Sequence, residues 1–212
     1  MAAGWVRRNY DGVGVTQYRP GQYLRAVQEH YLGKVLLCID VSGSMSGEPL
    51  RQAIMGGVGF VKEALGAAYR CGLLLWSDKV DVHVPLTAGE GEIFAALRNA
   101  STCGGTRLAP ALRTAIAELA PLAGDRVCCI FSDGDISDPQ RAAQLADRAR
   151  SAGIRFVVRG LGACAAAGLS DVVGADGNVT EQVVTDIGQV RGGITSMARS
   201  LRGRSGGLMP GS

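Results

Sequence analysis

The chain has 212 residues, 47% of them hydrophobic, which is enough for one domain with a full core and too few for a second large domain. Its 22 basic and 19 acidic residues give a net charge of +3, far below the basic excess that is typical of nucleic-acid-binding proteins. The N-terminus lacks the apolar core of a signal peptide, and no apolar run approaches the roughly 18 residues that cross a bilayer. We therefore expect a cytoplasmic protein that binds neither nucleic acid nor membrane.

Three parts are expected along the chain: an N-terminal extension at 1–33, a folded domain at 34–202 and a disordered tail at 203–212. Within the domain, apolar runs alternate with segments of helical spacing, an order typical of a parallel sheet covered by helices on both faces. The expected strands are 35–39, 70–76, 80–84, 126–131 and 155–158, and the expected helices are 49–65, 91–99, 110–119, 139–152 and 183–201. The fold class is therefore α/β.

One expected strand differs from the others. Residues 80–84 alternate between apolar and polar side chains, which is typical of a half-exposed edge strand, whereas 35–39 and 126–131 are almost continuously apolar, as central strands are. A short turn at 77–79 precedes the edge strand, so we expect it to run antiparallel to its neighbour. Trp76 and Asp78 are interpreted as core and hairpin residues.

Prolines and glycines mark the helices. Pro49, Pro110 and Pro139 stand at expected helix starts, where a missing N–H costs nothing. Asp138 is expected to cap the helix from Pro139, and Asp135 to lie on a solvated rim. The first helix contains three glycines, at 56, 57 and 59, which we attribute to close packing against the sheet.

The six cysteines do not indicate disulfides or zinc. Cys38, Cys128 and Cys129 lie in apolar strand segments, where a free cysteine behaves as a small buried hydrophobic residue. The sequence has no CxxC pair, so a zinc site is not expected. Reduced thiols are consistent with a cytoplasmic protein.

The most informative segment is DVSGS, from Asp40 to Ser44, because it directly follows an apolar strand. It places one carboxylate and two hydroxyls at alternate positions. Mg²⁺ prefers oxygen ligands and keeps several of its waters, so a few short oxygen side chains on one loop suit it. Turns and helix caps also use Ser and Asp, which is the simpler interpretation of any one of these residues.

This segment resembles the DxSxS motif of the von Willebrand factor A domain, and later segments fit that family in the same order. The segment STCGGTRLAPAL at 101–112 is similar to the family's Gly-Gly-Thr loop, and VCCIFSDG at 127–134 to its second buried strand, which ends in Ser-Asp-Gly. The hairpin expected at 74–86 lies between them. The resemblance covers about 33–202 and implies a Rossmann-like three-layer α/β/α fold with a mostly parallel sheet and one antiparallel edge strand.

The resemblance also implies a metal-ion-dependent adhesion site (MIDAS). Its ligands in this sequence would be Asp40, Ser42, Ser44, Thr106 and Asp133. The serines bind the ion directly in that family, the threonine joins or leaves with conformational state, and the aspartates act directly or through water. The expected cofactor is Mg²⁺, with Mn²⁺ or Ca²⁺ as alternatives.

The expected function is protein binding without catalysis, in which a partner protein supplies an Asp or Glu to the ion. The chain resembles stand-alone bacterial A-domain proteins that act beside AAA+ ATPases of the MoxR or chelatase type. It also resembles those that act beside kinase or phosphatase partners in stress-response and tellurite-resistance-like systems. Two alternatives stay open: a Mg²⁺-dependent phosphotransfer or hydrolase enzyme, and a scaffold whose metal site is vestigial.

Other motif matches are weaker. The acidic segment from Asp133 to Asp138 is not an EF-hand, because its sixth position is Asp138 rather than Gly and its twelfth is Gln144 rather than Glu. Residues 160–165 fit GxGxxA, but too few residues follow for a dinucleotide-binding unit. A serine hydrolase would need a GxSxG motif and a histidine within reach, and the histidines are His30 and His83.

Overall fold

The computed structural model describes residues 32–134, 136–174 and 183–204. Most of the expected N-terminal extension and the tail beyond Arg204 lie outside the described residues, as does Asp135.

The described strands form one sheet with the order β3-β2-β1-β4-β5-β6. They are β1 (Gly33–Asp40), β2 (Tyr69–Trp76), β3 (Val80–Val84), β4 (Arg126–Ser132), β5 (Ile154–Leu161) and β6 (Val183–Val184). All neighbouring pairs are parallel except β2 and β3, which are antiparallel. The expected mostly parallel sheet with an antiparallel edge strand is therefore confirmed.

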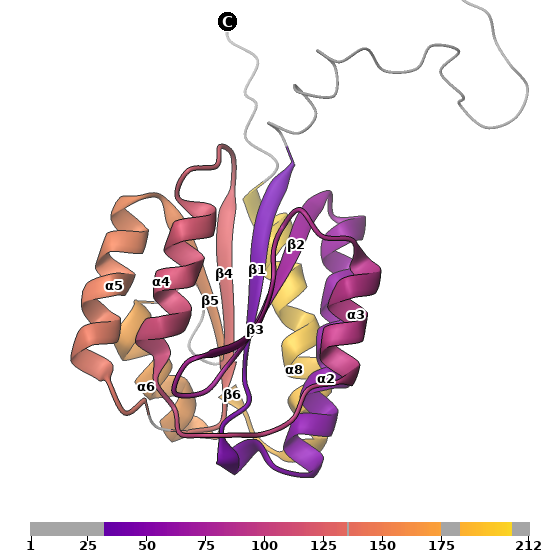
Figure 1. Cartoon of the computed structure of the whole chain (residues 1–212), viewed down its shortest axis with the longest axis vertical. Helices are drawn as coiled ribbons and strands as arrows, with labels where there is room; N and C mark the ends of the chain where they lie inside the picture. Colours follow the sequence, from indigo (N-terminus) through magenta and orange to yellow (C-terminus); the bar gives the residue numbers. More distant parts are fainter. Residues whose placement is uncertain (1–31, 135, 175–182, 205–212) are drawn as a thin grey trace, which may run out of the picture. The chain divides into compact units, whose positions relative to one another are not determined.

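Helices cover both faces of this sheet (Figure 1). The described α-helices are α2 (Glu48–Gly66), α3 (Glu90–Arg98), α4 (Leu108–Leu119), α5 (Pro139–Ser151), α6 (Ala163–Val173) and α8 (Val190–Met197). Short 3-10 helices occur at η1 (Gly43–Met45), η2 (Ile187–Gln189) and η3 (Ala198–Arg204). Helices α2, α3 and α8 lie on one face, and α4, α5 and α6 on the other (Figure 1). The α/β/α layers confirm the expected fold class.

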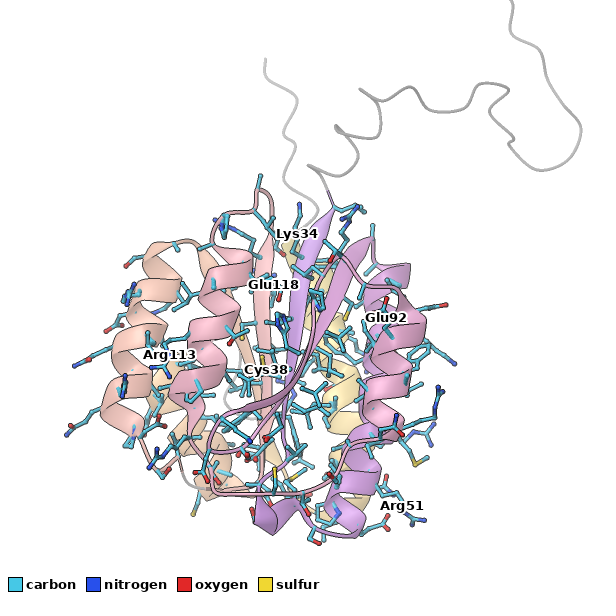
Figure 2. The ribbon with its side chains drawn as sticks, viewed as in Figure 1. Lys34, Cys38, Arg51, Glu92, Arg113 and Glu118 are labelled. Carbon is cyan, nitrogen blue, oxygen red and sulfur yellow. The ribbon has the colours of Figure 1, made fainter. Side chains whose placement is uncertain are left out.

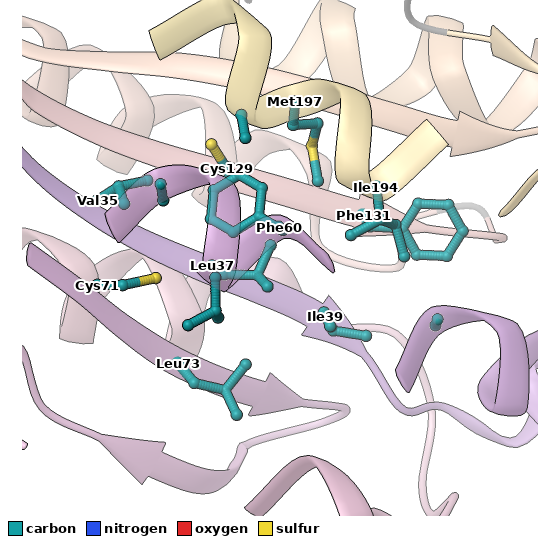
Figure 3. Packing of buried hydrophobic residues seen from close by; sticks show 14 of the residues in the cluster. Val35, Leu37, Ile39, Phe60, Cys71, Leu73, Cys129, Phe131, Ile194 and Met197 are labelled. Atoms are coloured by element: carbon teal, nitrogen blue, oxygen red, sulfur yellow. The ribbon is translucent and has the colours of Figure 1, made fainter. Parts of the chain in front are cut away.

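The core is divided by the sheet because successive side chains of a strand point to opposite faces. Val35, Leu37 and Ile39 of β1 pack with residues of α2 and α8, including Phe60 and Ile194 (Figure 3). The intervening residues of β1, Leu36 and Cys38, pack toward α4 and α5. Every residue of β1 is buried, which explains why this strand has almost no polar side chain before Asp40.

Toward the C-terminal end of the chain, one helix prediction was wrong and one helix was missed. The single helix expected at 183–201 is instead divided into β6, η2, α8 and η3, because Val183 and Val184 pair with the end of β5. Helix α6 was not predicted, since its sequence ACAAAGLSDVV has little polar and apolar alternation. It begins directly after the GxGxxA segment.

Gly160 and Gly162 of this segment allow α6 to pack closely against β5. A Cβ at Gly160 would collide with the backbone of Ala166 in the first turns of α6, so glycine lets the helix cross close to β5. Gly162 adopts φ +88°, a conformation that suits glycine, and donates its N–H to the carbonyl of Val184. The segment therefore turns the chain from strand to helix.

Candidate metal centre

The candidate site lies at the carboxyl edge of the sheet, where β1 and β4 end side by side. In an open parallel sheet, loops that follow neighbouring strands meet at this edge. Residues 34–39 of β1 pair with residues 126–131 of β4 in parallel register, so Asp40 and Asp133 follow adjacent strands. Arg51, in the first turns of α2, lies toward this end of the molecule, and Lys34, at the start of β1, lies toward the opposite end (Figure 2).

Asp40 is fully buried, and both of its carboxylate oxygens accept hydrogen bonds. The backbone N–H of Ser42 donates to Oδ1 at 2.7 Å, and the hydroxyl of Ser132 donates to Oδ2 at 2.5 Å. Ser132 is a part of the site that the sequence analysis did not name, although it directly precedes Asp133. The sequence analysis included it only in the Ser-Asp-Gly that ends the second buried strand and gave it no role in the site.

The serines connect the two loops. The hydroxyl oxygens of Ser42 and Ser44 are 3.1 Å apart, and Ser44 Oγ donates to Asp133 Oδ1 at 2.8 Å. Ser42 is buried and Ser44 is exposed, so this group of oxygen atoms extends from the sheet edge to the surface. The structure thus brings together the expected residues of the first and fourth strands.

Thr106 comes from a third segment, the loop before α4. An ideal Cβ built on Gly134 would lie 3.7 Å from both Ser44 Oγ and Thr106 Oγ1, so both hydroxyls lie close to Gly134. The backbone N–H of Gly43 donates to the carbonyl of Gly104 at 3.1 Å and ties the threonine loop to the serine loop. All five expected residues therefore lie around one region at the carboxyl edge of the sheet, which extends from the buried Asp40 to the exposed Ser44.

Burial perturbs the acidity of this region. Desolvation raises the pKa of Asp40 from 3.8 to about 6, although hydrogen bonds from Ser132 and Ser42 oppose the shift. The neighbouring charge of Asp133 raises it further. A cation at this site would favour the ionised form of Asp40 and offset the repulsion between the two carboxylates.

The donor set fits a hard cation. Two carboxylates and three hydroxyls offer only oxygen atoms, which is the chemistry that Mg²⁺, Mn²⁺ and Ca²⁺ share. No group of three or more His, Cys, Asp or Glu side chains suited to a metal occurs within the part of the chain that the structure describes. The hydroxyls are therefore essential to any metal site at these residues.

Asp138 has a different partner from the one expected. It precedes α5, but its side chain makes no cap bond to that helix. Instead, its carboxylate accepts the N–H groups of Leu108 at 2.8 Å and Ala109 at 3.1 Å, at the start of α4. The sequence predicted a cap from the neighbouring position, whereas the fold brings the start of another helix within reach.

This arrangement defines a class of protein: a three-layer α/β domain with oxygen side chains gathered at the carboxyl edge of its sheet. Residues 35–135 match the family model of the von Willebrand factor type A domain. Residues 35–135, together with the described fold, are therefore identified with the von Willebrand factor type A (vWA) domain family. Domains of this family mediate protein–protein interactions and carry a divalent-metal MIDAS. A search of curated protein sequences gives no match.

Solved structures share the fold at low sequence identity. The von Willebrand factor domain of the type V pilus tip protein Mfa5 from Porphyromonas gingivalis has a TM-score of 0.68 at 14% identity, over 86% of this chain and 98% of that one. An aerotolerance-related membrane protein from Bacteroides fragilis has a TM-score of 0.60 at 15% identity, over 79% and 99%.

A third structure contains a metal. Proximal thread matrix protein 1 from the mussel byssus, with a zinc-occupied MIDAS motif, has a TM-score of 0.63 at 14% identity and covers 82% of this chain. The present chain spans 46% of that protein, less than half its length.

Among the helices that the structure describes, none is both long and apolar enough to span a membrane.

Proposed function

We propose that this chain is a protein-binding module in which a divalent cation, physiologically Mg²⁺, is held at the candidate site and grips an acidic side chain of a partner. The observation that carries the proposal is the hydrogen-bond chain from Ser42 through Ser44 to Asp133, which joins the loops of two adjacent strands. A structural cap would need only one of these contacts. The convergence of hydroxyls and carboxylates from separate loops supports a ligand site.

Each residue has a distinct part in this proposal. Ser42, Ser44 and Asp133 would contribute oxygen ligands, and Thr106 a further hydroxyl from the third loop. Asp40, whose two oxygens already accept hydrogen bonds, would compensate the charge of the ion and orient the Ser42 backbone. The bound ion would supply net positive charge and a coordination position that a carboxylate can enter.

We infer that the site binds without catalysing a reaction. An enzyme of the hydrolase type would need a general base near the reacting atoms. His83 lies in the edge strand β3, and its Nε2 is 2.6 Å from Glu118 Oε2 of α4, so this imidazole is engaged with α4 and not with the candidate ligands. A phosphatase assay with and without Mg²⁺ tests the enzyme alternative, and metal-dependent turnover would overturn this inference.

The cellular setting is proposed from the sequence resemblance alone. We propose a cytoplasmic adaptor that acts beside an AAA+ ATPase or a kinase or phosphatase partner, in a bacterial stress response. Immobilised protein should retain such a partner in Mg²⁺ and release it in EDTA. Substitution of the partner's contacting Asp or Glu by Ala should give the same loss. Retention that survives EDTA would place the interface elsewhere.

Calorimetric titration with MgCl₂ and MnCl₂ tests the metal site directly. We expect Asp133→Ala and Ser44→Ala to weaken binding of both ions, with Mn²⁺ bound more tightly than Mg²⁺, as the general order of divalent affinities predicts. Asp147→Ala is the matched control, because it removes an exposed carboxylate of α5 that pairs with Arg150. Equal affinities in Asp133→Ala and the unmodified chain would contradict the proposal.

A further inference from the structure

The loop that carries Thr106 has no regular secondary structure of its own, since residues 99–107 lie between α3 and α4. Before Thr106, Cys103 N–H donates to the carbonyl of Val41 at 2.8 Å, and Gly104 accepts from Gly43. These bonds fix the start of the loop. The position of the threonine itself depends on what holds residues 105–109.

Asp78, in the turn between β2 and β3, holds the residue before Thr106. Its Oδ2 accepts the N–H of Gly105 at 2.8 Å. An ideal Cβ would lie 2.8 Å from this carboxylate at Gly104 and 2.9 Å at Gly105, so the double glycine lets the carboxylate reach the loop backbone. Gly104 also has φ +64°, which favours glycine.

The same turn contacts the residue after Thr106. The N–H of Arg107 donates to the carbonyl of Ser77 at 3.0 Å, and Arg107 Nε is 3.8 Å from Asp78 Oδ1. The β2–β3 turn therefore accepts backbone hydrogen bonds from the residues on both sides of the threonine.

Asp138 and Ser137, from the segment between β4 and α5, also hold the loop. Asp138 accepts the first N–H groups of α4, from Leu108 and Ala109, where the helix dipole favours a negative charge. The backbone N–H and the hydroxyl of Ser137 both donate to the carbonyl of Thr106, at 2.9 and 2.8 Å. Ser137 and Asp138 follow β4 in the chain, so these contacts connect the threonine loop to residues that come shortly after Asp133 in the sequence.

We infer that Asp78 and Asp138 are positioning residues, which hold the Thr106 hydroxyl where it can serve as a metal ligand. Neither carboxylate is a member of the candidate ligand set. Both act through backbone N–H groups within three residues of Thr106. This inference rests on the proposed function, because it concerns how the same site is kept in shape for the ion.

Mn²⁺ affinity, measured by electron paramagnetic resonance on the full chain, tests this role. Asp78→Ala, Asp138→Ala and Thr106→Val should each weaken Mn²⁺ binding by about 10-fold, the usual lower range for residues that support metal ligands. Adding either aspartate substitution to Thr106→Val should cause no further loss, because the group that they position is already absent. Unfolding curves establish that each variant is folded at the temperature of the titration.

The conservative variants separate positioning from charge. Asp78→Asn removes the negative charge but keeps an oxygen that can accept the N–H of Gly105, so it should retain near-normal Mn²⁺ affinity. Asp138→Asn keeps only one of the two acceptor oxygens that bind Leu108 and Ala109, so its Mn²⁺ affinity should lie between those of the unmodified chain and Asp138→Ala. Asp186→Ala is the matched control, because Asp186 also accepts a backbone N–H, from Gln189, but follows β6 near the other end of the strand order. It should leave Mn²⁺ affinity unchanged.

The outcomes are distinguishable. An Asp78→Asn variant as weak as Asp78→Ala, additive losses with Thr106→Val, or a Thr106→Val variant that binds normally would each overturn the inference. So would alanine variants that melt earlier but bind Mn²⁺ normally, because they would show a purely structural role. Failure of the unmodified chain to bind Mn²⁺ would instead contradict the proposed function.

Discussion

At the scale of single residues, Asp40 shows how burial and function conflict. Its carboxyl group is fully enclosed, and two hydrogen bonds only partly replace the water that it loses on folding. A carboxylate that served structure alone would be costly at this position. Its location beside Asp133 and two serine hydroxyls gives the cost a functional reason, since a cation would stabilise the charged form.

The raised pKa of Asp40 predicts how stability changes with pH in EDTA. Folding raises this pKa from 3.8 to about 6, so between these values the folded chain binds more protons than the unfolded chain. The contribution of Asp40 to stability is then greatest below pH 4 and falls as pH rises through 6, by on the order of 3 kcal/mol. Urea unfolding at a series of pH values measures this fall.

The Asp40→Asn variant isolates the effect. Its amide oxygen can still accept the N–H of Ser42, and the Ser132 hydroxyl can accept from the new amide group. We expect this variant to lack the fall in stability between pH 4 and 6 and to be at least as stable as the unmodified chain at pH 7 in EDTA. Equal pH dependence in the two proteins would show that another group titrates.

At the scale of elements, the glycines of α2 reflect contact with another helix. The sequence analysis attributed them to packing against the sheet, and Gly57 does face Ile39 and Leu97. Gly56 and Gly59, however, face α8, where the hydroxyl of Thr195 donates to the carbonyl of Gly56 at 3.3 Å. The approach of two helix backbones explains why this helix tolerates residues of low helix propensity.

Substitution of Gly56 should therefore destabilise the fold. A Cβ there would lie 2.9 Å from both the carbonyl oxygen of Arg191 and Cβ of Ile194, and overpacking of this kind costs roughly 1–3 kcal/mol. Gly66→Ala is the matched control, because its Cβ would meet open space at the end of the same helix and should stabilise by about 0.5–1 kcal/mol. Urea unfolding of both variants compares them. A Gly56→Ala variant as stable as Gly66→Ala would show that α8 moves aside easily.

The elements that can be predicted from the sequence are those whose pattern of apolar and polar residues is local. Strand β1 is continuously apolar, and β3 alternates, so each reveals its place in the sheet. The division of the C-terminal segment was not predictable, because it depends on the pairing of Val183 and Val184 with β5. The same limit applies at the site: Asp40, Ser42 and Ser44 lie in one short motif, whereas the bond from Ser132 spans 92 residues.

At the scale of the whole molecule, the sheet places structural residues along its strands and candidate binding residues at the strand ends. Its parallel strands are buried on both faces, so few polar groups can be placed along them without cost. Polar groups gather where the strands end. The carboxyl edge thus presents the loops that follow β1 and β4, and the turn after β2 holds the Thr106 loop beside them, an arrangement that favours a preorganised site.

The global consequence is a cation-dependent melting temperature. A ligand that binds only the folded state stabilises it, by about 2.7 kcal/mol at a free concentration of 100 times its dissociation constant. For a domain of this size, about 2–4 °C of melting temperature corresponds to each kcal/mol. We therefore expect Mg²⁺ to raise the melting temperature progressively up to millimolar concentrations, with Mn²⁺ acting at lower concentrations and EDTA reversing the effect of both ions.

The Asp133→Ala variant should fold normally and lose this response. Removing one of two crowded carboxylates relieves their repulsion, but it also removes a ligand of the ion. Circular dichroism at 222 nm measures the transition, with the Asp147→Ala control in parallel. A curve that neither ion moves would identify the site as vestigial or dependent on its partner. A grossly unfolded Asp133→Ala chain would mean that this carboxylate is structural.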